Sequence, residues 1–229
     1  MTDPAPTDSQ PTASAVTPGW ADVGVVLAVV LVPAVHNGFT HIVWPQLVPR
    51  FPPVGYHETA TLAMLAGWAA LVFYLIRHSG RPPARFGLVR PTWLDVPWAA
   101  GLFLVVWWAG ERLTGLFDHD LSLYPMPPVR AWQFALVVAG TLAVGFTEEL
   151  VWRGYLLTRL EELTASTWQA LTLTSLLFGL AHLYQGIGGP IHAAAFGLVC
   201  GGGFVVTRRL GPVALAHAGY DLVLATWDC

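Results

Sequence analysis

Long apolar segments dominate this chain and restrict what it can fold into. Seven segments with few charged side chains alternate with connections that are rich in proline and glycine, which end helices and turn the chain. A membrane-spanning helix needs roughly 20 apolar residues. A soluble helical bundle would show polar residues recurring at helical period, and most of these segments show none. The segments cover residues 20–35, 57–76, 94–117, 131–150, 168–182, 191–207 and 213–226.

The composition supports the same class of fold. Hydrophobic residues make up 55% of the chain and charged residues only 11%, against roughly 25% charged in soluble domains. The net charge of −3 leaves no basic face for nucleic acid. The two cysteines, Cys200 and Cys229, form neither a C-x-x-C pair nor a disulfide framework. We therefore expect an all-α, polytopic transmembrane bundle of about seven spans, surrounded by membrane lipid.

The chain divides into three parts. Residues 1–19 are rich in Pro, Thr, Ser and Asp and lack the positive start of a signal peptide, so we expect a disordered tail. Residues 20–130 are expected to form accessory transmembrane helices. Residues 131–227 are expected to form a catalytic helical core, because the intramembrane ionisable residues gather there.

Arginine placement predicts the orientation in the membrane. Cationic residues favour the cytoplasmic side, so the N-terminus is expected there and the C-terminus outside. If the first segment is only a re-entrant hairpin, the N-terminus lies on the opposite side of the membrane, and the predicted orientation of the other segments is unchanged. The absence of lysine and the Arg-, Gly-, Pro- and Ala-rich usage suggest a GC-rich bacterial genome, hence a plasma membrane. The arginines on the expected cytoplasmic side are Arg77, Arg81, Arg85, Arg90, Arg153, Arg159, Arg208 and Arg209.

A pair of adjacent glutamates ends the fourth apolar segment. No ionisable side chain occurs over residues 131–146, and then Glu148 and Glu149 are followed by Arg153. Intramembrane acids cost several kcal/mol and favour a functional hypothesis. In a helix, Glu149 and Arg153 share one face and can pair, while Glu148 is rotated by about 100° and could point into a cavity. The alternative is a solvated interfacial pair with Arg153 extending to the membrane surface.

Two later apolar segments carry histidines with a partner four residues away. The stretch FGLAHLY contains Phe178 and His182, and AHAGYDLV contains His217 and Asp221. A single such histidine is usually a core residue, but three polar clusters in three apolar helices favour a site. Desolvation disfavours a charged carboxylate, which suits general acid–base work near neutral pH, and histidine can share a water with it. These groups suffice to activate water against an amide carbonyl.

The depth of these residues in the membrane sets a condition on the fold. In the seven-span arrangement Glu148 and His217 lie toward the cytoplasmic side, whereas His182 lies near the outer end of a short fifth span. They meet only if the fourth helix continues past Leu150 or if the fifth is displaced inward. The chain has no helix breaker before Thr164, which favours a continued fourth helix.

The three motifs together resemble one protein family. E-E-x-x-x-R, F-x-x-x-H and H-x-x-x-[N/D], in this order on successive apolar helices, are similar to those of the CPBP family. That family comprises CAAX prenyl endopeptidases (Rce1-like) and bacterial bacteriocin-processing or self-immunity (Abi) proteins, and the resemblance covers residues 131–226. It implies an all-helical intramembrane protease, open to the cytoplasmic leaflet, that acts on a hydrophobic or lipidated peptide.

The resemblance also implies roles for the first two motifs. Glu148 would activate the water as a base, and His182 would hold or polarise that water. Glu149 would pair with Arg153 and support the helix that carries Glu148. Phe178 would be a packing residue or part of the wall of the substrate-binding site.

The third motif departs from the family pattern. His217 and Asp221 would occupy the oxyanion-side motif, but an ionised aspartate in place of asparagine cannot donate a hydrogen bond. Asp221 would then be protonated, or it would orient His217 or bind a metal. A metal such as zinc would take His182, His217 and a carboxylate as three ligands. A water activated without metal fits the same residues, so the cofactor stays open.

Functions of other classes compete with a protease. A catalytically silent membrane scaffold or immunity protein could keep the fold and bind a partner, although it would gain nothing from buried acids. A proton-coupled transporter predicts internal repeats, which the sequence does not show. A bis-histidine haem protein would need two facing histidine pairs. No feature of the sequence sets an oligomeric state.

Overall fold

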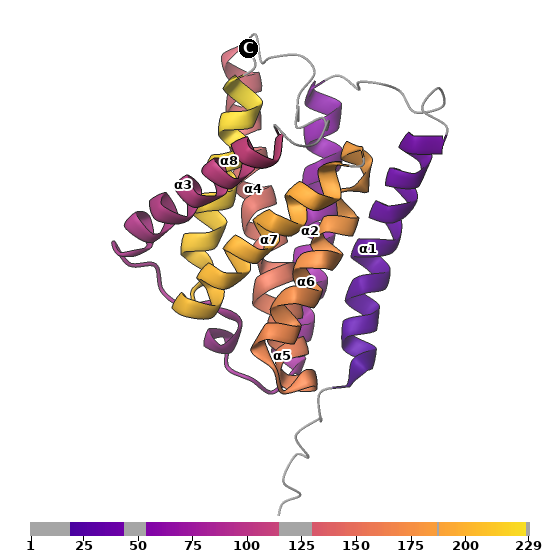
Figure 1. Ribbon diagram of the computed structural model, residues 1–229, viewed down its shortest axis with the longest axis vertical. Coiled ribbons are helices and arrows are strands. Elements are labelled where there is room, and N and C mark those ends of the chain that lie inside the picture. Colours follow the sequence, from indigo (N-terminus) through magenta and orange to yellow (C-terminus); the bar gives the residue numbers. More distant parts are fainter. Residues whose placement is uncertain (1–18, 44–53, 115–129, 187, 228–229) are drawn as a thin grey trace, which may run out of the picture.

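The computed structural model describes residues 19–43, 54–114, 130–186 and 188–227 (Figure 1). Over these residues it consists of helices and their connections, without a strand, which confirms the expected all-α class. The expected N-terminal tail lies outside the described residues except for Gly19. The α-helices are α1 (Trp20–Val43), α2 (Val54–His78), α3 (Asp95–Thr114), α4 (Ala131–Glu149), α5 (Thr158–Thr164), α6 (Thr167–Ala181), α7 (Gly188–Thr207) and α8 (Leu210–Trp227).

Seven of these helices correspond to the seven apolar segments of the sequence. Four stretches are long and apolar enough to cross a membrane by length and composition. By contrast α6 has only 15 residues, fewer than the roughly 20 that a span needs. It therefore depends on neighbouring helices to enclose it. The four long stretches are Trp20–Asn37, Ala60–His78, Ala131–Thr164 and Gly188–Thr207.

The fourth helix continues far beyond the glutamates, as the missing helix breaker predicts. Helix α4 passes directly into the π-helical segment η3 (Leu150–Leu157) and then into α5, and the three form one continuous apolar stretch of 34 residues. A π-helix has i→i+5 hydrogen bonds and is frequent at functional sites. Every residue of η3 is buried. The sequence carries no signal for this π-helical segment.

A tight turn folds α6 back along this long helix. Ala165 adopts the left-handed conformation with φ of 53°, and the Ser166 side chain caps α6 by accepting from the Gln169 backbone N–H. Residues at equal distances from such a turn lie side by side in an antiparallel hairpin. Glu148 and His182 stand equally many residues from Ala165, so the residue count of the two arms places them at a similar depth.

Glycines allow the helices to approach closely where the ionisable residues lie. A methyl group at Gly145 on α4 would lie 2.7 Å from the backbone nitrogen of Ala218 and 2.8 Å from the carbonyl oxygen of Ala214, both on α8. At Gly179 on α6 it would lie 2.5 Å from the carbonyl oxygen of Pro190 on α7. Small residues permit such backbone contacts in membrane bundles. Helices α4 and α8 therefore meet one turn before Glu149.

Ion pairs join the helices at the end of the bundle where α5 meets α1, the lower end in Figure 1. Arg159 is 1% exposed and binds Glu162 at 2.8 Å and Asp22 of α1 at 3.0 Å. Glu162 also accepts from Arg81 at 2.8 Å. Several arginines that the sequence assigns to the cytoplasmic side thus lie in one network that links α1, the end of α2 and α5.

Gly145→Val should destabilise the fold, because the added side chain meets backbone atoms of α8 that cannot move aside. Overpacking of this kind costs about 1–3 kcal/mol, and we expect a lower midpoint of thermal unfolding in detergent micelles. Gly101→Ala on α3 is the control, because nothing lies within 4 Å of the added methyl group. Equal unfolding midpoints for the two variants would contradict the close approach of α4 and α8.

Candidate active site

One buried carboxylate oxygen joins two helices at the centre of the site. Oε1 of Glu149 accepts from Nη1 of Arg153 at 2.7 Å and lies 2.8 Å from Nδ1 of His217. The Glu149 side chain has no exposed surface, and the side chains of Arg153 and His217 are 2% and 5% exposed. The four-residue spacing predicts the first contact. The second, across 68 positions in sequence, comes from the packing of α4 against α8.

The arginine of this cluster is also held by aromatic rings. The guanidinium carbon of Arg153 lies 4.4 Å above the ring of Phe178 and 6.0 Å from the ring of Phe196. Desolvated cation–π contacts contribute up to about 2 kcal/mol. Arg153 is part of η3, so the π-helical segment presents the charge to a carboxylate on one side and an aromatic face on the other.

Phe178 is the packing centre around which the histidines are arranged. Its ring lies 4.5 Å from the His182 ring and 6.2 Å from the His217 ring, measured between centroids. It also lies 5.6 Å from the ring of Trp152 in η3. The side chain is only 2% exposed, which favours the packing role over a wall of the substrate site. Both histidines are thereby held on the same side of the bundle.

His182 has a defined tautomer. It is the C-cap of α6, and its Nδ1 lies 2.8 Å from the backbone carbonyl oxygen of Phe178. A carbonyl oxygen only accepts, so Nδ1 carries the proton and donates it. In the neutral ring Nε2 then keeps its lone pair. His182 can therefore accept a hydrogen bond from a water through Nε2.

Asp221 faces the other nitrogen of His217. Its Oδ2 lies 3.6 Å from Nε2 of His217, which is beyond a direct hydrogen bond. His217 thus lies between two carboxylates, Glu149 at Nδ1 and Asp221 at Nε2. The geometry fits the expectation that Asp221 orients His217 better than the expectation that it donates to an oxyanion.

Glu148 has a buried carboxylate oxygen without a protein partner. Its side chain is half-buried, and Oε2 has no accessible surface and no hydrogen-bond partner among the described residues. It lies within electrostatic range of His217, Glu149 and Arg153. Leaving a buried polar atom unsatisfied costs roughly 1–3 kcal/mol, and such atoms commonly bind an ordered water. Glu148 therefore offers a free acceptor oxygen to a water, and Nε2 of His182 is a separate acceptor in the same part of the bundle.

The side chains do not fit the zinc site that the sequence leaves open. The part of the chain that the structure describes contains no group of three or more His, Cys, Asp and Glu side chains that could hold a metal ion. Both ring nitrogens of His217 face carboxylates, and His182 offers only Nε2. A zinc centre with three protein ligands needs more donors than this arrangement directs to one point.

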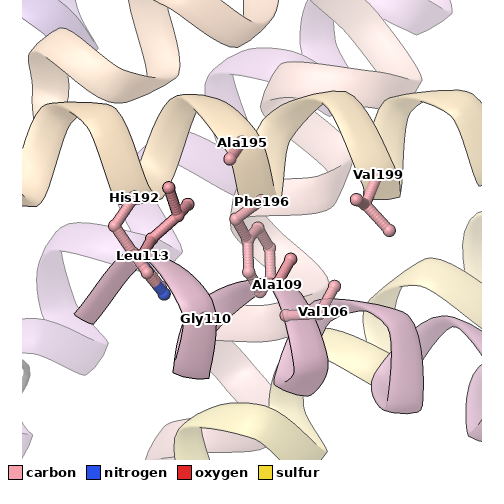
Figure 2. Close-up of a pocket in the computed structure, with 8 residues that line it drawn as sticks. All are labelled: Val106, Ala109, Gly110, Leu113, His192, Ala195, Phe196 and Val199. Atoms are coloured by element: carbon pink, nitrogen blue, oxygen red, sulfur yellow. The ribbon is translucent and has the colours of Figure 1, made fainter. Parts of the chain in front are cut away.

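A shallow pocket lies beside the site, between α3 and α7 (Figure 2). It is a surface depression that does not include Glu148, so the cavity expected at that residue is not this pocket. His192 lines it, and its Nε2 lies 3.0 Å from the Tyr220 hydroxyl. Phe196 lines it too, and its ring lies 4.6 Å from that of His217. No motif in the sequence pointed to Phe196 as a neighbour of the site.

The comparisons with known proteins bear on this part of the chain. Residues 130–223 match the family described as type II CAAX prenyl endopeptidase Rce1-like. The match runs from the start of α4 into α8 and contains the glutamates, Arg153 and both histidines of the site. No curated protein and no solved structure showed significant similarity to the chain. The resemblance drawn from the three motifs is thereby confirmed, and with the apolar helices it indicates an integral membrane protein.

Arg153→Met should destabilise the protein because it leaves Glu149 buried without its guanidinium partner. Removing one partner of a buried ion pair costs about 3–5 kcal/mol, measured here as a lower unfolding midpoint in detergent. Adding Glu149→Gln to Arg153→Met should recover part of the loss, because no unpaired charge then remains. Arg112→Met on the exposed surface of α3 is the control and should leave the midpoint unchanged. A wild-type midpoint for Arg153→Met would refute the structural role of the pair.

Proposed function

We propose that this chain, which carries an Rce1-like domain over residues 130–223, is an intramembrane endopeptidase that hydrolyses peptide bonds with a water activated by Glu148. The domain supports a CAAX-protease-family intramembrane endopeptidase at family level. The observation that carries the mechanism is the buried carboxylate oxygen of Glu148 that has no protein partner, and the residue count of the hairpin puts Nε2 of His182 at a similar depth. An acceptor pair of this kind is what a hydrolytic water requires.

The reaction follows from these two acceptors. A water bound between Glu148 and His182 gives one proton to the Glu148 carboxylate, and its oxygen attacks the carbonyl carbon of the peptide bond. The tetrahedral intermediate carries the negative charge on the former carbonyl oxygen. When the C–N bond breaks, Glu148 returns the proton to the leaving nitrogen. The products are a carboxylic acid and an amine, and Glu148 ends the cycle as a carboxylate.

The neighbouring cluster keeps these acceptors in place. Glu149 is paired with Arg153 and also contacts His217 of α8, so the helix face that carries Glu148 cannot rotate without separating this buried interhelical contact. His217 is fixed between Glu149 and Asp221. Its ring packs against Phe178, whose carbonyl oxygen orients His182. We assign Glu149, Arg153, His217 and Asp221 to positioning roles and Phe178 to packing.

The orientation and the substrate class are part of the proposal. The arginine-rich end of the bundle, where Arg81 and Arg159 bind Glu162, would lie on the cytoplasmic side of a bacterial plasma membrane. Glu148 and His182 stand at the far ends of the two helical arms from the turn at Ala165, so the site would lie deep in the membrane relative to that end. The apolar helices around Glu148 favour a hydrophobic or lipid-modified peptide over a soluble polar one.

Glu148→Gln should abolish peptide cleavage while leaving the fold intact, because glutamine has a similar shape but cannot take the proton. The loss of a general base lowers kcat by about 10²–10⁴-fold. Purified wild type and variant would be incubated in detergent with a library of hydrophobic and lipidated peptides, with cleavage read by mass spectrometry. The matched control is Glu111→Gln on the exposed surface of α3, which should cleave at the wild-type rate.

A chelator arm of the same experiment tests the chemistry of the water. Cleavage that persists with chelator supports a water activated by Glu148 without a metal, whereas cleavage lost with chelator and restored by zinc contradicts it. No cleavage by the wild type across a broad library would instead favour a catalytically silent scaffold or immunity protein of the same fold.

A further inference from the structure

Peptide hydrolysis at this site needs a hydrogen-bond donor for the carbonyl oxygen, which becomes negative in the tetrahedral intermediate. Most donors around Glu148 are already engaged. The Nδ1–H of His182 is bonded to a backbone carbonyl, and both ring nitrogens of His217 face carboxylates. Arg153 has a guanidinium nitrogen without a partner, but its side chain is only 2% exposed, packed against Phe178. Apart from Nε2 of His217, which lies 3.6 Å from Asp221 without a direct hydrogen bond, none of these groups presents a free N–H to a substrate.

Asp221 cannot fill this role as a carboxylate. An ionised aspartate has only acceptor oxygens, and a second negative group beside the intermediate would destabilise it. In this structure Asp221 faces Nε2 of His217. A donor that does not depend on the protonation of Asp221 or His217 would have to come from another side chain near Glu148.

Tyr184 presents such a donor. It lies in the short helix η4 (Leu183–Gln185), two residues after His182, and its ring centroid is 5.9 Å from the His182 ring. Its hydroxyl is within electrostatic range of the carboxylates of Glu148 and Asp221. The residue is 39% exposed, so a bound peptide can reach it. The hydroxyl accepts a long contact of 3.5 Å from Nε2 of Gln185 and keeps its own proton to donate.

The backbone around Tyr184 is held against α7. A methyl group at Gly189 would lie 2.8 Å from the carbonyl oxygen of His182 and 2.6 Å from Cβ of Gln185. The first turn of α7 therefore packs directly on η4. The backbone N–H of Gln185 also bonds to the carbonyl oxygen of His182 at 3.0 Å. These contacts hold the backbone of Tyr184 in place relative to His182.

We propose that Tyr184 is a further catalytic residue, whose hydroxyl donates a hydrogen bond to the oxyanion of the tetrahedral intermediate. This inference rests on the proposed endopeptidase function. No proton is transferred in this step, so the phenol stays neutral while the bond to the oxyanion forms and is then lost as the C–N bond breaks. The competing role is that of an aromatic ring at the membrane interface, which phenylalanine would fill equally well.

Tyr184→Phe separates the two roles, because it removes only the hydroxyl. With a peptide that the wild type cleaves, we expect kcat to fall by about 10²-fold, as for other oxyanion donors. We expect KM and the unfolding midpoint to stay near their wild-type values. The matched control is Tyr74→Phe, at an exposed position on α2, which should leave kcat unchanged.

A phosphinate analogue of the cleaved peptide supplies a second readout, because it mimics the charged tetrahedral intermediate. A residue that stabilises the oxyanion affects binding of the analogue and kcat by similar factors. Tyr184→Phe should therefore weaken binding of the analogue by about the same factor by which it lowers kcat. Binding of the uncharged peptide should change little. A purely structural role would weaken both ligands alike or lower the unfolding midpoint.

The outcomes keep the two proposals distinct. If the wild type cleaves, Glu148→Gln does not, and Tyr184→Phe retains wild-type kcat, then only the role of Tyr184 is overturned. If kcat falls but binding of the phosphinate is unchanged, the oxyanion contact is also overturned. If the wild type cleaves no peptide of the library, the endopeptidase proposal fails and the role of Tyr184 fails with it.

Discussion

The buried carboxylate of Glu149 is the interaction on which the arrangement of the site depends. A carboxylate without exposed surface is stable only when its charge is balanced and its oxygens are bonded. Glu149 meets the charge requirement through Arg153 from its own helix and His217 from α8, both at Oε1, while Oε2 has no hydrogen-bond partner among the described residues. The two contacts constrain each other, because they share Oε1. If α4 and α8 separated, or if the π-helical segment η3 unwound, the Glu149 carboxylate would lose one of its two partners in an apolar interior. The pair within the helix and the packing of α4 on α8 therefore stabilise each other.

This constraint explains how a half-buried carboxylate and a fully buried one can stand side by side. Glu149 is turned into the protein, and helix geometry then turns its neighbour Glu148 by about 100° toward the half-buried face of the helix. Glu148 keeps an oxygen without a protein partner because its neighbour takes the guanidinium. The difference between the two acids therefore arises from their environment and not from their residue type.

The sequence predicted what depends on local spacing. The pair between Glu149 and Arg153 follows from a separation of four residues, and the continued fourth helix follows from the lack of a helix breaker before Thr164. The contact of Glu149 with His217 could not be predicted, because it depends on how closely α4 and α8 pack. The π-helical turn was also hidden, since its apolar residues suit an α-helix equally well. Tyr184 lies outside the F-x-x-x-H spacing, so the sequence did not single it out. Only the structure shows that η4, which carries Tyr184, packs on α7.

In the hairpin of the long fourth helix and α6, the number of residues between Glu148 and His182 determines whether the two side chains can meet. Glu148 and His182 are placed at a similar depth because the turn at Ala165 lies midway between them in sequence. One residue added on either arm would move one partner by about 1.5 Å along the axis and rotate it by about 100°. Insertions in the outer connections leave this register untouched. Homologous chains with the same chemistry should therefore vary in length outside this hairpin and keep the count between these two residues constant.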